Sequence, residues 1–253
     1  SSFKGEKYTA IGTSQGLFLY YGEAFYDITP LDTAITGADF DTVEGSSTVT
    51  VNKGSHGLAV GRYITFTGVV TPNGFTSSTT FTEGAFEILT VPNDNTFTIQ
   101  TPIAAVAGAS SGTGGATINP YIIVGPTTQT VGYGWGTYLW GNSTWGTERS
   151  TSNVVLVPGN WSLDNFGEVL VATIFDGRTF TWNAGAAGPR GIRASQSTTN
   201  FNTTNNPTAT RISIVSDRDR HLFHLGTETT IGDASTQDPM FVRFSNQEDL
   251  NTY

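Results

Sequence analysis

The clearest pattern of hydrophobic and polar positions lies in Glu168–Asn183, EVLVATIFDGRTFTWN. An apolar run leads to Asp176-Gly177, and beyond it Phe180 and Trp182 alternate with two threonines. Alternation with a period of two is typical of a β-strand. Asp-Gly between two such runs favours a tight turn, because glycine tolerates the positive φ that the turn needs. The segment therefore predicts a β-hairpin.

The same pattern occurs twice more in the chain. Lys7–Tyr21 has its turn at Ser14–Gly16 and runs into a third predicted strand over Ala24–Leu31. Arg220–Ser245 places a long loop, Ile231–Pro239, between two apolar runs. Strand groups that recur along a chain are typical of the blades of a β-propeller.

The spacing of the repeats indicates an incomplete propeller. Ala172 and Phe223 hold equivalent places in the second and third hairpins, 51 residues apart, and we assign Ala10 to the same place in the first. Propeller blades take roughly 40–50 residues, and closure needs about four to eight of them. The chain has room for too few, so we expect a segment of a longer polypeptide.

The pattern changes over Thr36–Val124. An acidic stretch around Asp39 is followed by predicted strands at Ser47–Val51, Arg62–Thr67, Ala85–Val91, Thr96–Thr101 and Ala116–Val124. We expect residues 36–124 to form a small all-β, barrel- or sandwich-like module of five or six strands. It is inserted between residues 1–35 and 125–253, which form the antiparallel propeller blades. The predicted fold class is all-β.

Composition narrows the class of protein. Of 253 residues, 37% are hydrophobic and only 13% are charged, with a net charge of −9. An acidic surface disfavours direct nucleic-acid binding, except through a local basic patch. The chain has no cysteine, hence no disulfide and no thiolate metal site, and no apolar run reaches the length of a membrane span.

Val131–Arg149 is rich in aromatic residues and glycine, and it holds three of the five tryptophans. Large rings among flexible glycines need a surface to pack against. The rings either pack onto the propeller itself or contact a neighbouring subunit, where Trp and Tyr are favoured. The candidate contact residues are Tyr133, Trp135, Tyr138, Trp140 and Trp145.

No catalytic, cofactor-binding or metal site stands out. His221 and His224 lie near Asp217 and Asp219, but an odd separation on a strand sends two side chains to opposite faces. We therefore interpret both histidines as structural and expect no cofactor.

A glycosidase is a weaker alternative. Thr173–Trp182 resembles in part the aspartate-box turn of sialidase-type propellers, but Gly177 follows Asp176 directly, so the spacing differs. Glycoside hydrolysis needs two carboxyl groups at a defined separation, which the sequence does not establish. The scattered candidates are Asp27, Asp32, Glu148, Asp164 and Glu168.

Several segments, taken in order, resemble the propeller-bearing tail hub or nozzle proteins of short-tailed bacteriophages, also described as tail-stabilisation or head-completion proteins. Members of that family extend further at both ends. The segments that carry the resemblance are Gly5–Leu31, His56–Gly68, Gly132–Arg149, Trp161–Ala172, Asp219–Gly226 and Asp238–Tyr253.

The resemblance implies a virion component that is not an enzyme. Its copies would form a homo-oligomeric ring, expected to be hexameric, between the portal-adaptor ring and the tail fibres or spikes. DNA would pass through the lumen without specific binding. Two alternatives stay open: a carbohydrate-binding adhesion protein that uses Trp135, Trp140 and Trp145, and a secreted propeller glycoside hydrolase.

Overall fold

A computed structural model describes residues 2–3, 6–108, 115–124, 159–184, 194, 205–250 and 252–253. The described elements are almost all antiparallel β-strands, which confirms the all-β class. The chain divides into two compact units, Ser1–Thr29 with Ile123–Tyr253 (unit 1) and Pro30–Ile122 (unit 2). No described helix is long and apolar enough to cross a membrane.

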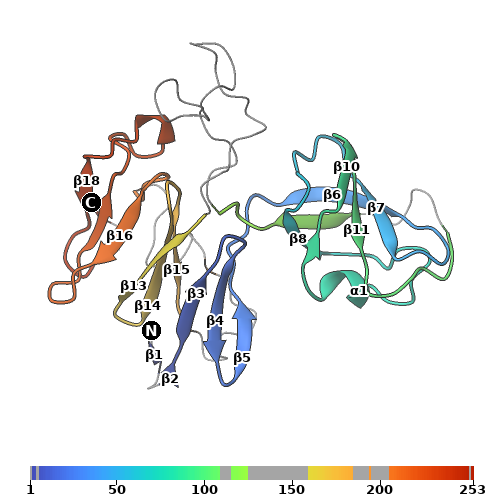
Figure 1. Ribbon diagram of the computed structural model, residues 1–253, viewed down its shortest axis with the longest axis horizontal. Coiled ribbons are helices and arrows are strands. Elements are labelled where there is room, and N and C mark those ends of the chain that lie inside the picture. Colours follow the sequence, from blue (N-terminus) through green and yellow to red (C-terminus); the bar gives the residue numbers. More distant parts are fainter. Residues whose placement is uncertain are drawn as a thin grey trace, which may run out of the picture. The chain divides into compact units, whose positions relative to one another are not determined.

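Unit 2 is built on one seven-stranded antiparallel sheet in the order β10-β11-β7-β6-β12-β8-β9 (Figure 1). A one-turn helix, α1 (Thr79–Thr82), places Phe81 in the core of this unit, against Phe40, Phe75 and Phe86. The strands are β6 (Ile35–Asp41), β7 (Thr48–Asn52), β8 (Tyr63–Thr67), β9 (Phe86–Glu87), β10 (Thr90–Asn93), β11 (Thr96–Gln100) and β12 (Ala116–Pro120).

This sheet has seven strands instead of the five or six predicted, because β6 was not predicted and one predicted strand is two. The acidic residues of β6 made this segment look like a loop. In the structure Ala38 and Phe40 are buried, while Asp39 and Asp41 lie on the opposite face of the strand. The predicted strand Ala85–Val91 is also split, because β9 pairs with β8 and β10 pairs with β11.

Unit 1 contains three antiparallel sheets of three strands each, and they confirm the three predicted hairpins. A two-stranded hairpin, β1 (Ser2–Phe3) with β2 (Glu6–Lys7), and a short 3-10 helix, η2 (Ala234–Thr236), complete it. Sheet 1 is β3 (Thr9–Gly12), β4 (Leu17–Tyr21) and β5 (Ala24–Asp27); sheet 2 is β13 (Trp161–Phe166), β14 (Val169–Ile174) and β15 (Thr179–Trp182); sheet 3 is β16 (Ile212–Val215), β17 (Leu222–Leu225) and β18 (Val242–Phe244).

The register corrects one assignment of the repeat. Ala172 and Phe223 do lie on the central strands of sheets 2 and 3, each between two neighbours. Ala10 lies on the first strand of sheet 1, and its partner Leu19 holds the central place instead. The error arose because the predicted hairpin joins the first two strands of sheet 1, whereas the predicted hairpins of sheets 2 and 3 join the last two strands.

The Asp176-Gly177 turn forms where it was predicted, but its two residues exchange roles. The positive φ belongs to Asp176, at 54°. Gly177 is needed for space, because a Cβ there would lie 3.0 Å from the Cβ of Ile174. Arg211 and Gln237 both bind the Asp176 carboxylate, at 3.3 and 2.9 Å, and so tie this turn of sheet 2 to sheet 3.

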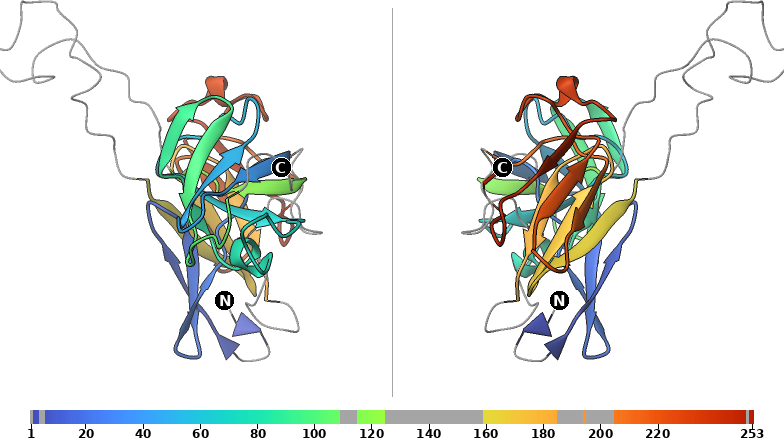
Figure 2. Two further views of the ribbon diagram at one scale, coloured as in Figure 1. Left: turned by 90° about the vertical axis from the view of Figure 1, so that its right-hand side faces the viewer. Right: turned by 90° about the vertical axis from the view of Figure 1, so that its left-hand side faces the viewer.

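Sheet 2 lies between the other two sheets of unit 1, as Figures 1 and 2 show. On one side, the Trp161 indole donates to the carbonyl of Thr13 at 2.9 Å. On the other side, the Ser162 hydroxyl donates to the carbonyl of Ser213 at 2.7 Å. Every residue of β15 is therefore buried, threonines included. The described residues form this open stack of three sheets, and they show no closed ring of blades.

Candidate functional site

The interface between sheets 2 and 3 contains a row of buried polar side chains. Thr179 and Thr173 join their hydroxyls at 2.9 Å, and the Thr173 hydroxyl donates to Ser213 Oγ at 2.8 Å. Ser213 Oγ lies 2.9 Å from His224 Nδ1, and His224 Nε2 lies 2.9 Å from the Tyr253 hydroxyl. We call this row the polar network.

The polar network has one consistent direction of donation. The Tyr253 hydroxyl donates to Asn206 Oδ1, so it accepts from His224 Nε2. A neutral imidazole with its proton on Nε2 leaves Nδ1 as an acceptor for the Ser213 hydroxyl. Every hydroxyl then donates once along the row, so none is left unsatisfied.

Burial fixes these protonation states. It lowers the pKa of His224 to about 3, and the nearby Arg243 charge adds to the shift in the same direction. Burial also raises the pKa of the Tyr253 hydroxyl above its ordinary value. Both groups are therefore neutral across the physiological range.

A serine beside a histidine is the pairing used by nucleophilic hydrolases, but this pair does not fit that role. Ser213 is 2% exposed and His224 is 0% exposed, so no substrate carbonyl can reach the hydroxyl. A base with a pKa near 3 is also far from the value that general-base catalysis needs at neutral pH. The polar network joins two sheets.

His224 lies on β17 and His221 directly precedes this strand, and their side chains lie on opposite faces of sheet 3. His221 Nδ1 lies 2.7 Å from the Ser245 carbonyl, and its ring packs beside Phe223 and Phe244, whereas His224 belongs to the polar network. The described residues contain no group of three or more His, Asp or Glu that could hold a metal ion.

The carboxylates considered for glycoside hydrolysis are spread over both units and bound locally. Asp164 accepts from the backbone N–H groups of Asn165 at 2.8 Å and Val215 at 2.7 Å. Asp27 and Asp32 accept, respectively, from the backbone N–H of Thr29 at 2.9 Å and from Arg62 at 2.6 Å. Glu168 lies exposed in the β13–β14 turn, and Glu148 is outside the described residues. None of the four described carboxylates is seen paired with another.

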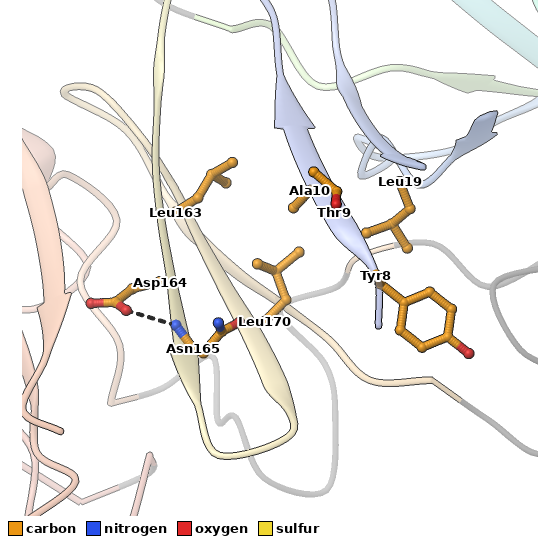
Figure 3. A pocket seen from close by; sticks show the side chains of 8 residues that line it. All are labelled: Tyr8, Thr9, Ala10, Leu19, Leu163, Asp164, Asn165 and Leu170. Atoms are coloured by element: carbon orange, nitrogen blue, oxygen red, sulfur yellow. Dashed lines mark hydrogen bonds between the residues drawn. The ribbon is translucent and has the colours of Figure 1, made fainter. Parts of the chain in front are cut away.

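A cavity of about 280 Å³ opens between sheets 1 and 2 (Figure 3). Leu19, Leu163 and Leu170 give it an apolar lining, with Tyr8, Thr9, Ala10, Asp164 and Asn165 around them. Its volume is at the low end for a ligand site, and its one carboxylate already accepts two backbone hydrogen bonds. We interpret it as a packing gap at the edge of two sheets.

The most unusual surface of unit 1 is the face of sheet 3 that points away from sheet 2. The strand register places six side chains on it, and all six are apolar. Four of them are 45–56% exposed, and the other two are half-buried. Its residues are Ile212, Ile214, Phe223, Leu225, Val242 and Phe244.

The residues that the sequence singled out as contacts, Tyr133, Trp135, Tyr138, Trp140 and Trp145, all lie outside the described residues. Their role stays a prediction. The polar network was not predicted from the sequence, because its members come from strands far apart in the chain. The signal was present in Thr173 and Ser213, polar residues at inward positions of otherwise apolar strands.

Comparison with known proteins gives little. No protein-family model and no curated protein sequence matches this chain. Among solved structures, it is similar to the phage phi92 endosialidase, at 15% identity and a TM-score of 0.26. The match covers 98% of this chain and 37% of that protein. A likeness at this TM-score carries no argument about fold or activity.

Proposed function

We propose that this chain is a structural component of a bacteriophage tail and forms part of a ring-shaped nozzle or hub. The proposal starts from the six sequence segments, from Gly5–Leu31 to Asp238–Tyr253, that resemble the tail hub or nozzle proteins of short-tailed bacteriophages. The observation that supports it most is the exposed apolar face of sheet 3, which is suited to a contact with another protein surface. The Ser213–His224 pair, in contrast, is buried and out of reach of a substrate.

The proposed partners follow from the same family. Copies of the chain form the ring, a portal-adaptor ring lies on one side, and tail fibres or spikes attach on the other. A net charge of −9 suits a duct through which DNA passes without binding, because like charges repel. The location is the virion, and the chain acts without a cofactor.

Electron microscopy of the purified chain tests this function. We expect ring-shaped particles with a central channel. In parallel, the chain is incubated with a panel of oligosaccharides that includes polysialic acid, and released reducing ends are measured. We expect no release above buffer.

Two results contradict the proposal. Glycan cleavage by single, unassembled chains favours the hydrolase. Glycan binding that is lost in Trp135→Ala, Trp140→Ala or Trp145→Ala variants, again without rings, favours the adhesion protein.

A further inference from the structure

Three loops of unit 2 meet at the end of this unit that lies opposite its two chain connections. The chain enters and leaves unit 2 side by side, where the Ile122 N–H donates to the Pro30 carbonyl. The strands β6, β8 and β11 run parallel to one another and lead into residues 42–47, 68–78 and 101–108. We call these three segments the distal loops.

Hydrogen bonds join the distal loops to one another. The Val106 N–H donates to the Gly74 carbonyl at 2.8 Å. The Thr42 hydroxyl lies 2.9 Å from the Asn73 carbonyl oxygen and 3.2 Å from the Ala107 carbonyl oxygen. Gly74 has a φ of 89°, and a Cβ there would collide with the Ala107 carbonyl. The distal loops therefore pack closely and form one fixed surface.

This surface exposes apolar side chains. Val43, Val70, Ile103 and Val106 all lie in the distal loops and are 50–69% exposed. The two most exposed of them belong to loops in contact, because a Cβ at Gly108 would lie 3.9 Å from the Val43 Cα. Apolar side chains that gather at the surface mark an interaction site. Loops already fixed in place also lose little conformational entropy when they bind.

Charge is distributed unevenly along unit 2. The unit has seven carboxylates and two cationic side chains, Lys53 and Arg62. Lys53 follows β7 at the strand end away from residues 42–47. Arg62 precedes β8 at the end away from residues 68–78, and it binds Asp32 at 2.6 Å. Glu44 is the one charged residue within the distal loops, and Asp41 directly precedes them. The apolar surface therefore has an acidic rim.

We propose that the distal loops bind a partner protein whose contact surface is apolar at its centre and basic at its rim. The exposed valines meet the apolar centre, and Glu44 and Asp41 face the basic rim. Opposite charges across an interface speed association and select the partner. A contact between the distal loops of two copies would bring two acidic rims together, which is unfavourable. The inference goes beyond the proposed function and does not require a ring.

Synthetic peptides added to the isotope-labelled full chain test this by NMR. The probe repeats Lys-Leu-Gly-Ser. One comparison peptide replaces each Leu by Ser, and a second replaces each Lys by Glu. We expect only the Lys-Leu peptide to shift amide signals, and we expect the shifted signals to belong to residues 42–47, 72–75 and 101–108. Added salt should weaken this binding, because it screens the charges.

Two variants and a matched control separate the apolar contribution from the charge. The double variant Val43→Thr, Val106→Thr keeps the shape of both side chains and should bind the Lys-Leu peptide about tenfold more weakly, a loss of about 1.4 kcal/mol. The control Val60→Thr changes a valine of similar exposure, 62% against 66% for Val43, outside the distal loops and should bind like the wild-type chain. Glu44→Gln should weaken binding and reduce its salt dependence. Unchanged signals elsewhere in each spectrum demonstrate folding.

Several results overturn the inference. The Lys-Leu peptide shifts no signals, or shifts signals outside the distal loops; or the Glu-Leu peptide binds the distal loops as tightly; or the double variant binds like Val60→Thr. Dimers of the wild-type chain that are lost in the double variant also overturn it, because the occupant is then a second copy. None of these results decides whether the chain forms rings, which electron microscopy tests separately.

Discussion

At the scale of single residues, unit 1 uses its ionisable and hydroxyl side chains to hold sheets together. His224 illustrates this, because it is neutral and buried and links the Ser213 hydroxyl to the Tyr253 hydroxyl. A histidine whose folded pKa lies below its unfolded pKa stabilises the fold only while it stays neutral. Protonation of His224 is therefore expected to change the free energy of unfolding of unit 1.

We expect unit 1 to lose stability on acidification. The folded pKa of His224 is about 3 and the ordinary pKa of histidine is 6.5, so the unfolded chain binds the proton first. The stabilisation is complete above about pH 6.5 and falls by up to about 1.4 kcal/mol per pH unit towards pH 3. Urea unfolding at a series of pH values measures this. The His224→Gln variant should lose that part of the slope, and the control His221→Gln should keep it.

We expect Thr173→Val to destabilise unit 1 by about 1–3 kcal/mol, because it removes the acceptor of the buried Thr179 hydroxyl and the hydroxyl that donates to Ser213. The control is Thr90→Val, which removes an exposed hydroxyl pair with Thr98 in unit 2 and should cost less than about 0.5 kcal/mol. Thermal unfolding measures both. Equal effects of the two changes would count against a structural polar network.

At the scale of elements, the contact between sheets 1 and 2 depends on a missing side chain. Gly12 ends β3 opposite Trp161, and a Cβ at Gly12 would lie 2.7 Å from the Trp161 Cβ. The Trp161 Cβ cannot move away without shifting β13. Close approach between two sheets is thus built into the sequence at one glycine.

Gly12→Ala should therefore destabilise unit 1 by about 1–3 kcal/mol through overpacking. Gly54→Ala is the matched control, because its added Cβ meets only Asn95 Oδ1 at an ordinary 3.5 Å. Chemical denaturation of both variants measures the difference. A Gly12→Ala protein as stable as the control contradicts the close contact.

How far the elements follow from the sequence depends on the range of the interactions. The three hairpins were predicted because their turns and alternation are local. The alternation in Thr179–Trp182 indicates a strand with one wet face, yet both faces are buried. The second face is buried because sheets 1 and 3 pack on the two sides of sheet 2. Their residues lie far from β15 in the sequence, so the local pattern of β15 cannot predict this packing. The strand β6 was not predicted because Asp39 and Asp41, which are half-buried on the face opposite Ala38 and Phe40, are residues typical of a loop.

At the scale of the whole molecule, unit 2 has the means to fold by itself. Its ends are held together by Asp32 N–H bound to the Pro120 carbonyl at 2.8 Å and Ile122 N–H bound to the Pro30 carbonyl at 2.9 Å. Arg62 reinforces this pairing, because its guanidinium binds both Asp32 and the Tyr121 carbonyl. The unit also has a core of its own around Phe81.

Residues 30–122 expressed alone should therefore give a dispersed NMR spectrum and a cooperative thermal transition. Arg62→Met should lower the midpoint of that transition, because it leaves the Tyr121 carbonyl and the Asp32 carboxylate without their guanidinium partner. Lys53→Met, at the residue that directly follows β7 in the same unit, serves as the control. A collapsed spectrum for residues 30–122 contradicts an independent unit.

At this scale the proposed function requires that copies of the chain close into a ring. A high-resolution electron microscopy map of the assembled wild-type chain tests this most directly. We expect a ring with a central channel, in which the exposed apolar side chains of sheet 3, Ile212, Ile214 and Phe244, are covered by another part of the particle. Single, unassembled particles, or a ring in which that face is bare, contradict the proposed function.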